Sequence, residues 1–453
     1  MKAQLSYLRD YITENLWVIP SLLTASAIAL SFALVALDRS PWGQGLADRD
    51  WVYPIDPRGA RLTLSTLAGS MITVTSLVFS LTILALTVAA QQLGPRLLRS
   101  FVRDRVTQVV LGIFLSTFVF ALLVLRAVND TDGDRFVPYC SLTAALILAV
   151  MSFGALIFFM HHIANTIQAD TVIANITDDL HAVLARTFPK SEAEESDEAA
   201  EPDGASAHQA VRDKGEFVPA TRSGYVQIID YEGLLQLATE KDLCISLPVR
   251  NGHFLIPGSA LSFVTPADAV TKEVTATIRN AVLIGTRRTP AQDLEFLLAN
   301  LVEIAVRALS PGVNDHYTAT ACIDRLCEAV AEVLRRPPLS ATIADDEGSV
   351  RLVREPPTFP HLLDSAFNEI RQSAPDNVAI LSRLADRLVM LDGLAERLAD
   401  RQAILRHGEW IEESARRLVS NQDDRSRITG TLTALKSDRG DRSGRLEMES
   451  APT

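Results

Sequence analysis

Polar side chains on one face of a long uncharged stretch are the first candidates for a chemical role. No charged residue lies between Leu62 and Pro95. At 100° per residue, one face of a helix through this stretch carries Gly69 together with Thr66, Ser70, Thr73, Ser76, Ser80, Thr87 and Gln91. In a bilayer, such a face is expected to contact water or a neighbouring helix in place of lipid. Two interpretations stay open, a pore-lining face and a face for close helix packing.

Basic residues follow this stretch directly. Gly94 and Pro95 predict the end of the helix, and Arg96, Arg99 and Arg103 come next. Clustered arginines beside a membrane helix indicate the cytoplasmic side. These three arginines are therefore the candidates for the inner mouth of a pore, if the helix lines one.

A candidate anion site lies much further along the chain. Thr289 and Gln292 have the spacing of a capping box, and Pro290 between them suits the first helical position. The pattern predicts a helix from Pro290 to about Leu309. Free N–H groups and the helix dipole favour negative charge at such an end.

Arginines next to this predicted helix start are the natural partners of an anion. Arg287 and Arg288, with Thr289, are the candidate residues for binding a phosphate or a lipid headgroup. The alternative is an internal ion pair, in which Asp293 or Glu295 already neutralises the arginines. The sequence leaves both interpretations open.

A second polar group is interpreted as structural. The segment Ser310–Asp315 contains proline and glycine and separates the first helix from a second one predicted over His316–Arg336. We expect Asn314 and Asp315 to cap the second helix and, with Asp293, to form a structural polar cluster.

The sequence indicates no catalytic or metal chemistry. It contains no glycine-rich phosphate loop, nucleophile elbow or HExxH helix, and its four cysteines have no metal-ligand spacing. His161 and His162 are adjacent, so on a helix they point about 100° apart and are poorly placed to share one metal. We predict no catalytic residues, no metal, no cofactor and no enzymatic activity.

Four apolar segments must position the polar face in the membrane. Each is long enough to span a bilayer, and they cover residues 16–37, 64–93, 106–125 and 136–160. Lys2 and Arg9 agree with the arginines after the second span in favouring a cytoplasmic N-terminus. The sequence thus predicts a multi-pass protein of the bacterial inner membrane, with both termini in the cytosol.

The rest of the chain has a different composition. Of 43 Lys/Arg and 55 Asp/Glu, residues 1–169 contain 12 and 10, so residues 170–453 contain 31 and 45, a net charge of −14. This acidity argues against a nucleic-acid partner. We predict a helix extension and acidic linker over 170–222, followed by a small α+β module over 223–286 and a mainly helical domain with a flexible tail over 287–453.

Periodicity supplies the elements of this second part. Strands are predicted over 225–229, 244–249 and 261–264, with a short helix over 231–239 between the first two. A hairpin is expected from 341 to 354, and helices near 360–373, 376–404 and 408–419. The predicted fold class is therefore multi-domain, an α-helical four-span membrane domain joined to a cytosolic α+β domain in which a small β-rich module precedes a helical bundle.

Several motifs together resemble a known family. The run from Gly69 to Thr75, the segment Gln91-Gln-Leu-Gly-Pro-Arg96, and the segment Ala308-Leu-Ser-Pro-Gly-Val-Asn-Asp315 are similar to the predicted bacterial membrane proteins grouped as domain of unknown function 2254. The likeness covers roughly residues 10–420. It implies a multi-span inner-membrane protein with a cytosolic domain and supplies no activity.

Two functions are compatible with these features. The first is a homo-oligomeric ion channel or transport pathway, lined by the hydroxyl face of the second span and regulated by the cytosolic domain. Several chains are required, because four spans enclose little space. The alternative is a membrane-anchored sensor or scaffold that binds an anionic small molecule, a lipid or a protein through the cytosolic domain. The expected partners are thus the lipid bilayer, further copies of the chain and an anionic ligand.

Overall fold

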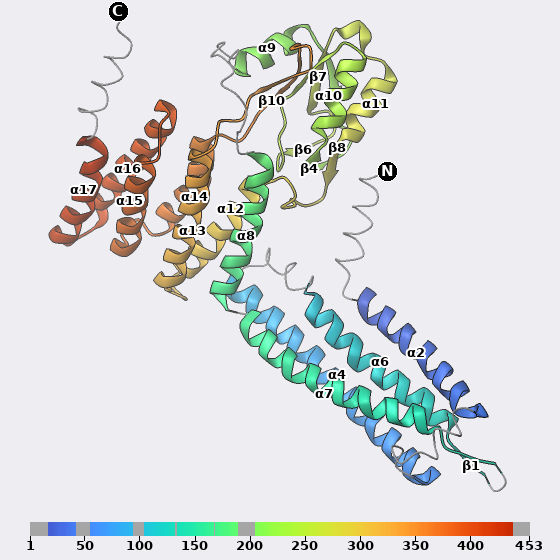
Figure 1. Cartoon of the computed structure of the whole chain (residues 1–453). Coiled ribbons are helices and arrows are strands. Elements are labelled where there is room, and N and C mark those ends of the chain that lie inside the picture. The colour runs from blue at the N-terminus through green and yellow to red at the C-terminus, as the bar shows by residue number, and fades with distance from the viewer. Residues whose placement is uncertain are drawn as a thin grey trace, which may run out of the picture. The chain divides into compact units, whose positions relative to one another are not determined.

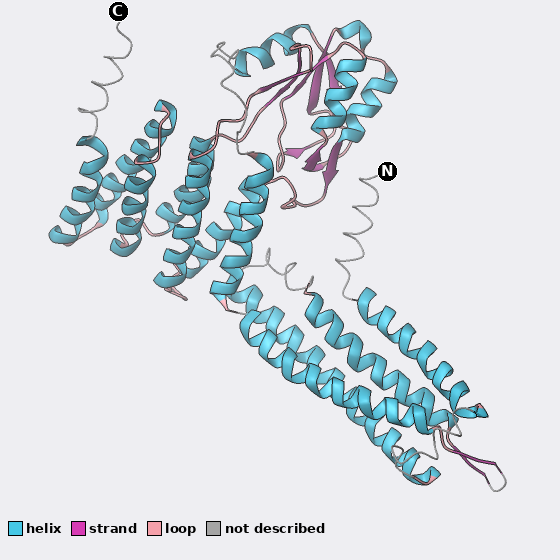
Figure 2. Ribbon diagram, in the orientation of Figure 1, coloured by secondary structure: helices cyan, strands magenta, loops and turns pink. Residues whose placement is uncertain are grey.

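The chain divides into two compact units, each of which is described here by itself. The computed structural model describes residues 17–41, 55–93, 104–131, 134–166, 168–188 and 204–437 (Figure 1). Unit 1 comprises Met1–Val172, and unit 2 comprises Ile173–Thr453. Helices dominate both units, and unit 2 also contains the larger β-sheets (Figure 2).

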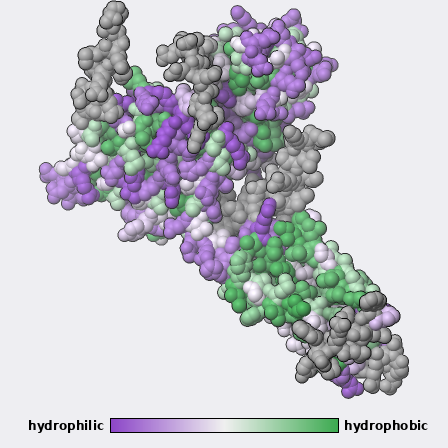
Figure 3. Space-filling view, viewed as in Figure 1, coloured by the Kyte–Doolittle hydropathy of each residue, from purple (hydrophilic) through white to green (hydrophobic). Residues whose placement is uncertain are grey.

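Unit 1 contains four helices long and apolar enough to cross a membrane. They are α2 (Val18–Arg39), α4 (Pro57–Leu93), α6 (Arg105–Ala127) and α7 (Tyr139–Thr166). Their described surface is mostly hydrophobic on the face shown in Figure 3. The prediction of four apolar helices is confirmed, although α4 begins at Pro57, earlier than expected, and its charged residues Arg58 and Arg61 lie in the first turns.

Helix α6 is the centre of this unit. It packs against α2, α4 and α7, and its side chains Phe114, Phe120 and Val124 are fully buried. Gly112 allows the closest approach to α2, since a Cβ there would lie 2.5 Å from Leu23 Cδ1. The small residue therefore favours close packing of α2 against α6 at this point.

Two acidic side chains fix the ends of these helices. Asp104 caps α6, accepting hydrogen bonds from the N–H groups of Val106 and Thr107, and it also lies 2.8 Å from His162 Nε2 at the far end of α7. Asp38, near the end of α2, caps the start of α7. A short hairpin of β1 (Asn129–Thr131) and β2 (Asp134–Phe136) connects α6 to α7.

Unit 2 contains two sheets. The five-stranded sheet has the order β3 (Glu216–Pro219), β7 (Ala260–Thr265), β5 (Cys244–Leu247), β10 (Val350–Arg354) and β9 (Thr342–Ala344). The three-stranded sheet has the order β6 (Phe254–Leu255), β4 (Gly224–Ile229) and β8 (Val282–Gly285). Short helices α10 (Tyr231–Glu240) and α11 (Lys272–Ala281) and the 3-10 turn η2 (Ala267–Ala269) connect the strands.

The larger sheet draws strands from outside residues 223–286. The hairpin of β9 and β10 forms as predicted, but β10 also pairs in parallel with β5, so Leu352 lies opposite Ile245 and Arg354 opposite Leu247. Part of the predicted linker is ordered too, because residues 204–214 form helix α9 (Gly204–Lys214) and β3 follows it. The acidic run from Glu192 to Glu201 lies outside the described residues.

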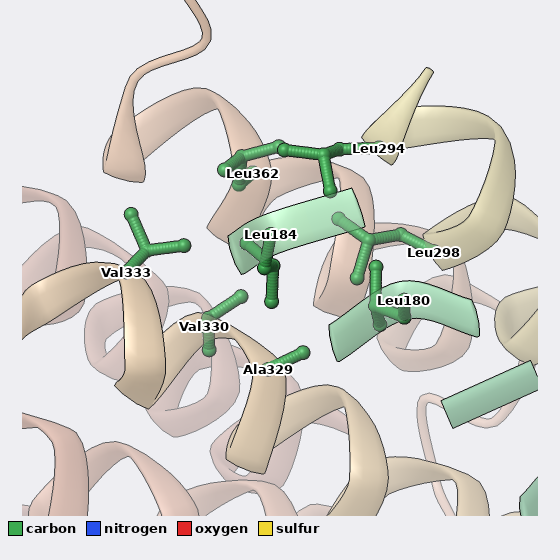
Figure 4. Close-up of a pocket in the computed structure, with 8 residues that line it drawn as sticks. All are labelled: Leu180, Leu184, Leu294, Leu298, Ala329, Val330, Val333 and Leu362. Carbon is green, nitrogen blue, oxygen red and sulfur yellow. The ribbon is translucent and has the colours of Figure 1, made fainter. Parts of the chain in front are cut away.

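The remaining helices of unit 2 surround an apolar core. They are α8 (Ala169–Thr187), α12 (Leu294–Ala308), α13 (His316–Leu334), α14 (Phe359–Ser373), α15 (Val378–Asp392), α16 (Leu398–Leu418) and α17 (Gln422–Ser437). Where α8, α12, α13 and α14 meet, leucines and valines leave a gap of only about 10 Å³ (Figure 4). Such a gap is too small for a ligand and is ordinary core packing.

Two helix boundaries differ from the predictions. The expected helix over 376–404 is two helices, because α15 ends at Asp392 and Gly393 caps it. The expected helix start at Pro290 is wrong, since α12 begins at Leu294. Its N-cap is Asp293, whose Oδ1 accepts a hydrogen bond from Phe296 N.

Candidate functional site

The polar face of α4 is exposed along its whole length. Every predicted pore-lining residue is exposed in the chain: Thr66, Ser70, Thr73, Ser76, Ser80, Thr87 and Gln91. The opposite side of the same helix is buried, and Val78, for example, has no exposed surface. The structure thus brings these residues onto one surface that no other described part of unit 1 covers.

The hydroxyl groups on this face bond to their own helix. Ser70, Thr73, Ser76, Ser80 and Thr87 each donate to the carbonyl oxygen four residues earlier, at 2.8–3.0 Å. Serine and threonine commonly satisfy themselves in this way inside helices. Each hydroxyl oxygen can still accept a hydrogen bond from water or from a neighbouring helix.

Helix α7 provides an internal comparison. Its exposed large side chains are Leu146, Ile147, Val150, Met151, Phe153, Ile157, Phe158 and Met160. This surface has the composition expected of a helix face in contact with lipid. The exposed surface of α4 is more polar because it carries the hydroxyl groups. It also exposes six large apolar side chains, Leu62, Ile72, Leu77, Phe79, Ile83 and Leu84.

The predicted inner-mouth residues Arg96, Arg99 and Arg103 lie outside the described residues. Asp104, the next residue, is described and pairs with His162 at the end of α7. His161 instead lies 2.9 Å from Asn165 of its own helix. The adjacent histidines therefore point to different partners.

The predicted anion site is arranged as an internal ion pair. Arg288 donates from Nε and Nη2 to the two carboxylate oxygens of Asp293, both at 2.7 Å. Asp293 is only 3% exposed and also caps α12. Burial lowers and the bond to Asp293 raises the pKa of Arg288, with a net rise. The negative charge favoured at the N-terminus of α12 is thus the carboxylate of Asp293 itself.

The other two members of the predicted anion site do not join this pair. The side chain of Arg287 is exposed, and its carbonyl accepts a hydrogen bond from Gln227 Nε2. Thr289 Oγ1 is buried and has no hydrogen-bond partner among the described residues. The capping box is wrong because Gln292 turns away from Thr289 and accepts the backbone N–H of Ile229.

Gly252 explains how the ion pair fits beside the loop after β5. Its φ is +86°, and a Cβ would lie 2.5 Å from Asp293 Oδ2 and 2.6 Å from Arg288 Nη2. A residue without a side chain is therefore needed at this contact.

The predicted polar cluster does not form as one group. Asp293 caps the start of α12, whereas Asn314 and Asp315 follow its end, so the length of the helix, about 22 Å, separates them. Asp315 caps α13 as expected, and the Thr318 hydroxyl that it binds lowers the pKa of its carboxyl. Asn314 adopts a left-handed conformation with φ of +52°.

A cavity of about 310 Å³ in unit 2 was missed by the sequence predictions. Its polar lining comes from the end of α8 (Arg186, Thr187), the start of α10 (Tyr231), the loops after β5 and β10, and the start of α12. Arg250 and Asn251 follow β5, Arg354 is the last residue of β10, and Glu355 follows it. Arg250 follows the strand predicted over 244–249, and Arg354 ends the hairpin predicted over 341–354. Local patterns do not reveal that these two strands pair in parallel and bring both arginines to one cavity.

The charges in this cavity are unevenly paired. Arg250 Nη2 lies 3.1 Å from Glu295 and 2.7 Å from His361, and Nη1 lies 3.8 Å from Glu355. Arg354 donates from Nε to Ser340 O and lies over the Tyr231 ring at 5.3 Å. Burial lowers the pKa of Arg354 and raises that of Tyr231.

Acid–base groups elsewhere in unit 2 form no recognisable catalytic arrangement within the described ranges. His208 Nδ1 lies 2.6 Å from Ser246 Oγ, but Ser246 is buried in β5. No cluster of histidine, cysteine and acidic residues suited to a metal is present among the residues described. The prediction of no metal and no enzymatic activity stays a prediction.

Comparison with known protein families identifies the family of this chain. Residues 13–390 match the family described as predicted membrane protein, DUF2254. The chain belongs to this family. This match confirms the resemblance expected from the motifs. The polar face of α4 and the residues that line the cavity all lie inside the matched range.

Relatives within the curated proteins carry no stated activity. The DUF2254 chain is 31% identical over 430 residues to proteins of Mycobacterium bovis and Mycobacterium tuberculosis that are described as uncharacterized. The alignment covers 93% of the chain and 80% of each relative. No solved structure matches the chain.

Proposed function

We propose that the chain is one subunit of a homo-oligomeric channel or transport pathway in the bacterial inner membrane, with the polar face of α4 turned toward the pathway. The observation that carries the proposal is the full exposure of this face in a single chain. In the proposed oligomer, this exposed face contacts a second copy of the chain or water between the copies.

The alternative of a lipid-facing α4 is less favourable. The i to i−4 hydrogen bonds satisfy the hydroxyl protons, so exposure to lipid is not prohibitive at any single position. Across the whole face, however, hydroxyl side chains gain less from contact with lipid than apolar side chains would, and the exposed side of α7 carries such apolar side chains. The contrast between these two surfaces supports an interior position for α4.

A passive route suits this face better than a proton-coupled carrier. No Asp, Glu, Lys or Arg lies from Leu62 to Pro95, and acidic or basic side chains within spans are the usual mark of proton relays. Conduction along serine and threonine hydroxyls requires no such group. Arg96, Arg99 and Arg103 would then surround the cytosolic end, with unit 2 in the cytosol as the regulatory part.

A cross-linking experiment tests the oligomeric arrangement. In a Cys140→Ser/Cys244→Ser background, in which the remaining Cys322 and Cys327 are buried, Ser76→Cys should form disulfide-linked dimers in lipid vesicles after mild oxidation. Val150→Cys on α7 is the matched control, because Val150 is 73% exposed but lies on the apolar surface. Efficient linking of Val150→Cys without linking of Ser76→Cys would place α7 at the centre and contradict the proposal.

A membrane-anchored sensor is the second candidate, and the cavity of unit 2 favours it. The two functions are compatible in one chain, since a ligand-binding cytosolic unit can regulate a pathway.

A further inference from the structure

We propose that the cavity of unit 2 binds a soluble phosphate monoester, with Arg354 and Arg186 holding the phosphate. This inference stands whether or not α4 lines a pathway, because every residue that it uses belongs to unit 2.

The position of the cavity is the first argument. Strands β5 and β10 run parallel, and Arg250 and Arg354 come from their carboxyl ends. Ligands of sheets with parallel strands typically bind just beyond the carboxyl ends of those strands. A volume of about 310 Å³ lies at the lower end of the usual range for small-molecule sites.

The charge balance is the second argument. Among the described residues, no carboxylate pairs with Arg354 or Arg186, whereas Arg250 is engaged by Glu295 and Glu355. Arg288 neutralises Asp293 from outside the cavity. Arg186 and Arg354 contribute +2, and Arg250 with Glu295 and Glu355 contributes −1, so the groups at the cavity, Arg288 and Asp293 included, carry a net charge of +1. This balance favours an anionic ligand, and two guanidinium groups without a carboxylate partner suit the oxygens of a phosphate monoester.

The geometry of Arg354 is the third argument. The hydrogen bond from Nε to Ser340 O and the contact with the Tyr231 ring hold the guanidinium in place. Its two terminal nitrogens have no hydrogen-bond partner in the described part of the chain. A fixed guanidinium with free terminal N–H groups is suited to grip phosphate oxygens.

The remaining lining fits an organic body attached to the phosphate. The Tyr231 hydroxyl has no partner among the described residues, and Thr187 lies on the same wall. Leu294, Leu339 and Pro356 add apolar surface. An organic group with one or two hydroxyls would contact both kinds of surface, which inorganic phosphate alone would not.

The test uses the full chain in a neutral detergent. Its melting temperature is measured with adenosine monophosphate, with adenosine, and with inorganic phosphate against chloride at equal ionic strength. We expect adenosine monophosphate to raise the melting temperature by roughly 2–4 °C near saturation, inorganic phosphate to raise it less, and adenosine to have no effect.

Three variants locate the effect. Arg186→Gln changes an exposed side chain that has no hydrogen bond or ion pair with other described residues, so it should fold normally and lose the shift. Arg354→Gln should lose it as well, and Arg222→Gln, an exposed arginine outside the cavity, should retain it. If Arg354→Gln fails to fold, Arg186→Gln decides the question.

Three results would overturn the inference. One is the absence of any shift in the parent chain with either phosphate compound. Another is an equal shift in the parent and in Arg186→Gln. The third is a shift produced only by anionic lipid added to the detergent, which would assign the arginines to a lipid headgroup.

Discussion

Asp38 near the end of α2 accepts a hydrogen bond from Ser141 Oγ at the start of α7, at 2.6 Å. The same carboxylate oxygen accepts the backbone N–H of Ser141 at 3.0 Å, and the other oxygen accepts that of Cys140 at 2.9 Å. Asp38 is buried, so these bonds are its main compensation for leaving water. One side chain thus joins the first and fourth candidate spans.

Replacing this carboxylate should weaken unit 1. Asp38→Ala removes all three bonds and the capping charge of α7, so we expect a loss of about 1–3 kcal/mol in unfolding free energy. Thermal unfolding in detergent measures the effect. Ser141→Ala removes only the hydroxyl bond and should have a smaller effect; equal losses in the two variants would show that the backbone bonds contribute little.

Two adjacent arginines should behave differently. Arg288→Gln leaves the buried Asp293 without its bidentate partner, so we expect unfolding free energy to fall by about 1–3 kcal/mol. Arg287→Gln changes an exposed side chain and should stay within about 0.5 kcal/mol of the parent. Chemical denaturation measures both variants.

A stable Arg288→Gln variant would support the anion site that was predicted from the sequence. If Arg288→Gln unfolds like the parent and instead abolishes stabilisation by phosphate, Arg288 is available to a ligand. The internal ion pair would then be a minor contact.

The stability of unit 2 should also depend on pH through His407. Burial lowers the pKa of this imidazole despite the carboxylate of Asp364 at 2.8 Å, while Arg406 and Arg371 nearby also lower it. The unfolded chain therefore binds the proton at higher pH than the folded chain does. The contribution is present above about pH 6.5 and is lost as pH falls toward the lower folded pKa.

A variant isolates this dependence. His407→Gln should be less stable than the parent at pH 7.5, with the difference shrinking as pH is lowered to about 5. Denaturant unfolding at several pH values measures it. A difference that grows on acidification would mean that the charged imidazole, paired with Asp364, is the stabilising form.

The membrane topology gives a prediction for unit 1. Arginines cluster after α4, so reporter fusions after Arg105 and after Gln168 should report the cytoplasm, and one at Asp132 should report the external side. Activity of paired cytoplasmic and periplasmic reporters measures this. A cytoplasmic signal at Asp132 would contradict four crossings.

Local patterns predicted much of the fold because they depend on neighbouring residues. The apolar segments, the strand at Tyr225–Ile229 and the cap at Asp315 all follow from spacing within a few residues. The start of α12 was misplaced because two capping signals compete within five residues. Asp293 prevails, since it binds both Phe296 N and Arg288.

The cavity depends on contacts that local patterns do not contain. Arg354 and Tyr231 are far apart in the sequence and meet only because β10 joins β5 in one sheet. Likewise, the polar face of α4 was predicted from periodicity, but its exposure depends on which side packs against α6. Long-range pairing decides both.

Reaction of single cysteines with a charged, water-soluble thiol reagent in membranes tests the central claim most directly. In a Cys140→Ser/Cys244→Ser background, in which the remaining Cys322 and Cys327 are buried, Thr73→Cys, Ser76→Cys and Ser80→Cys should react, because they are expected to lie on a wetted surface. Val78→Cys on the buried side and Val150→Cys on the apolar face of α7 should not. Protection of all three positions on α4 would contradict a water-accessible pathway and reduce the hydroxyl face to a surface for helix packing.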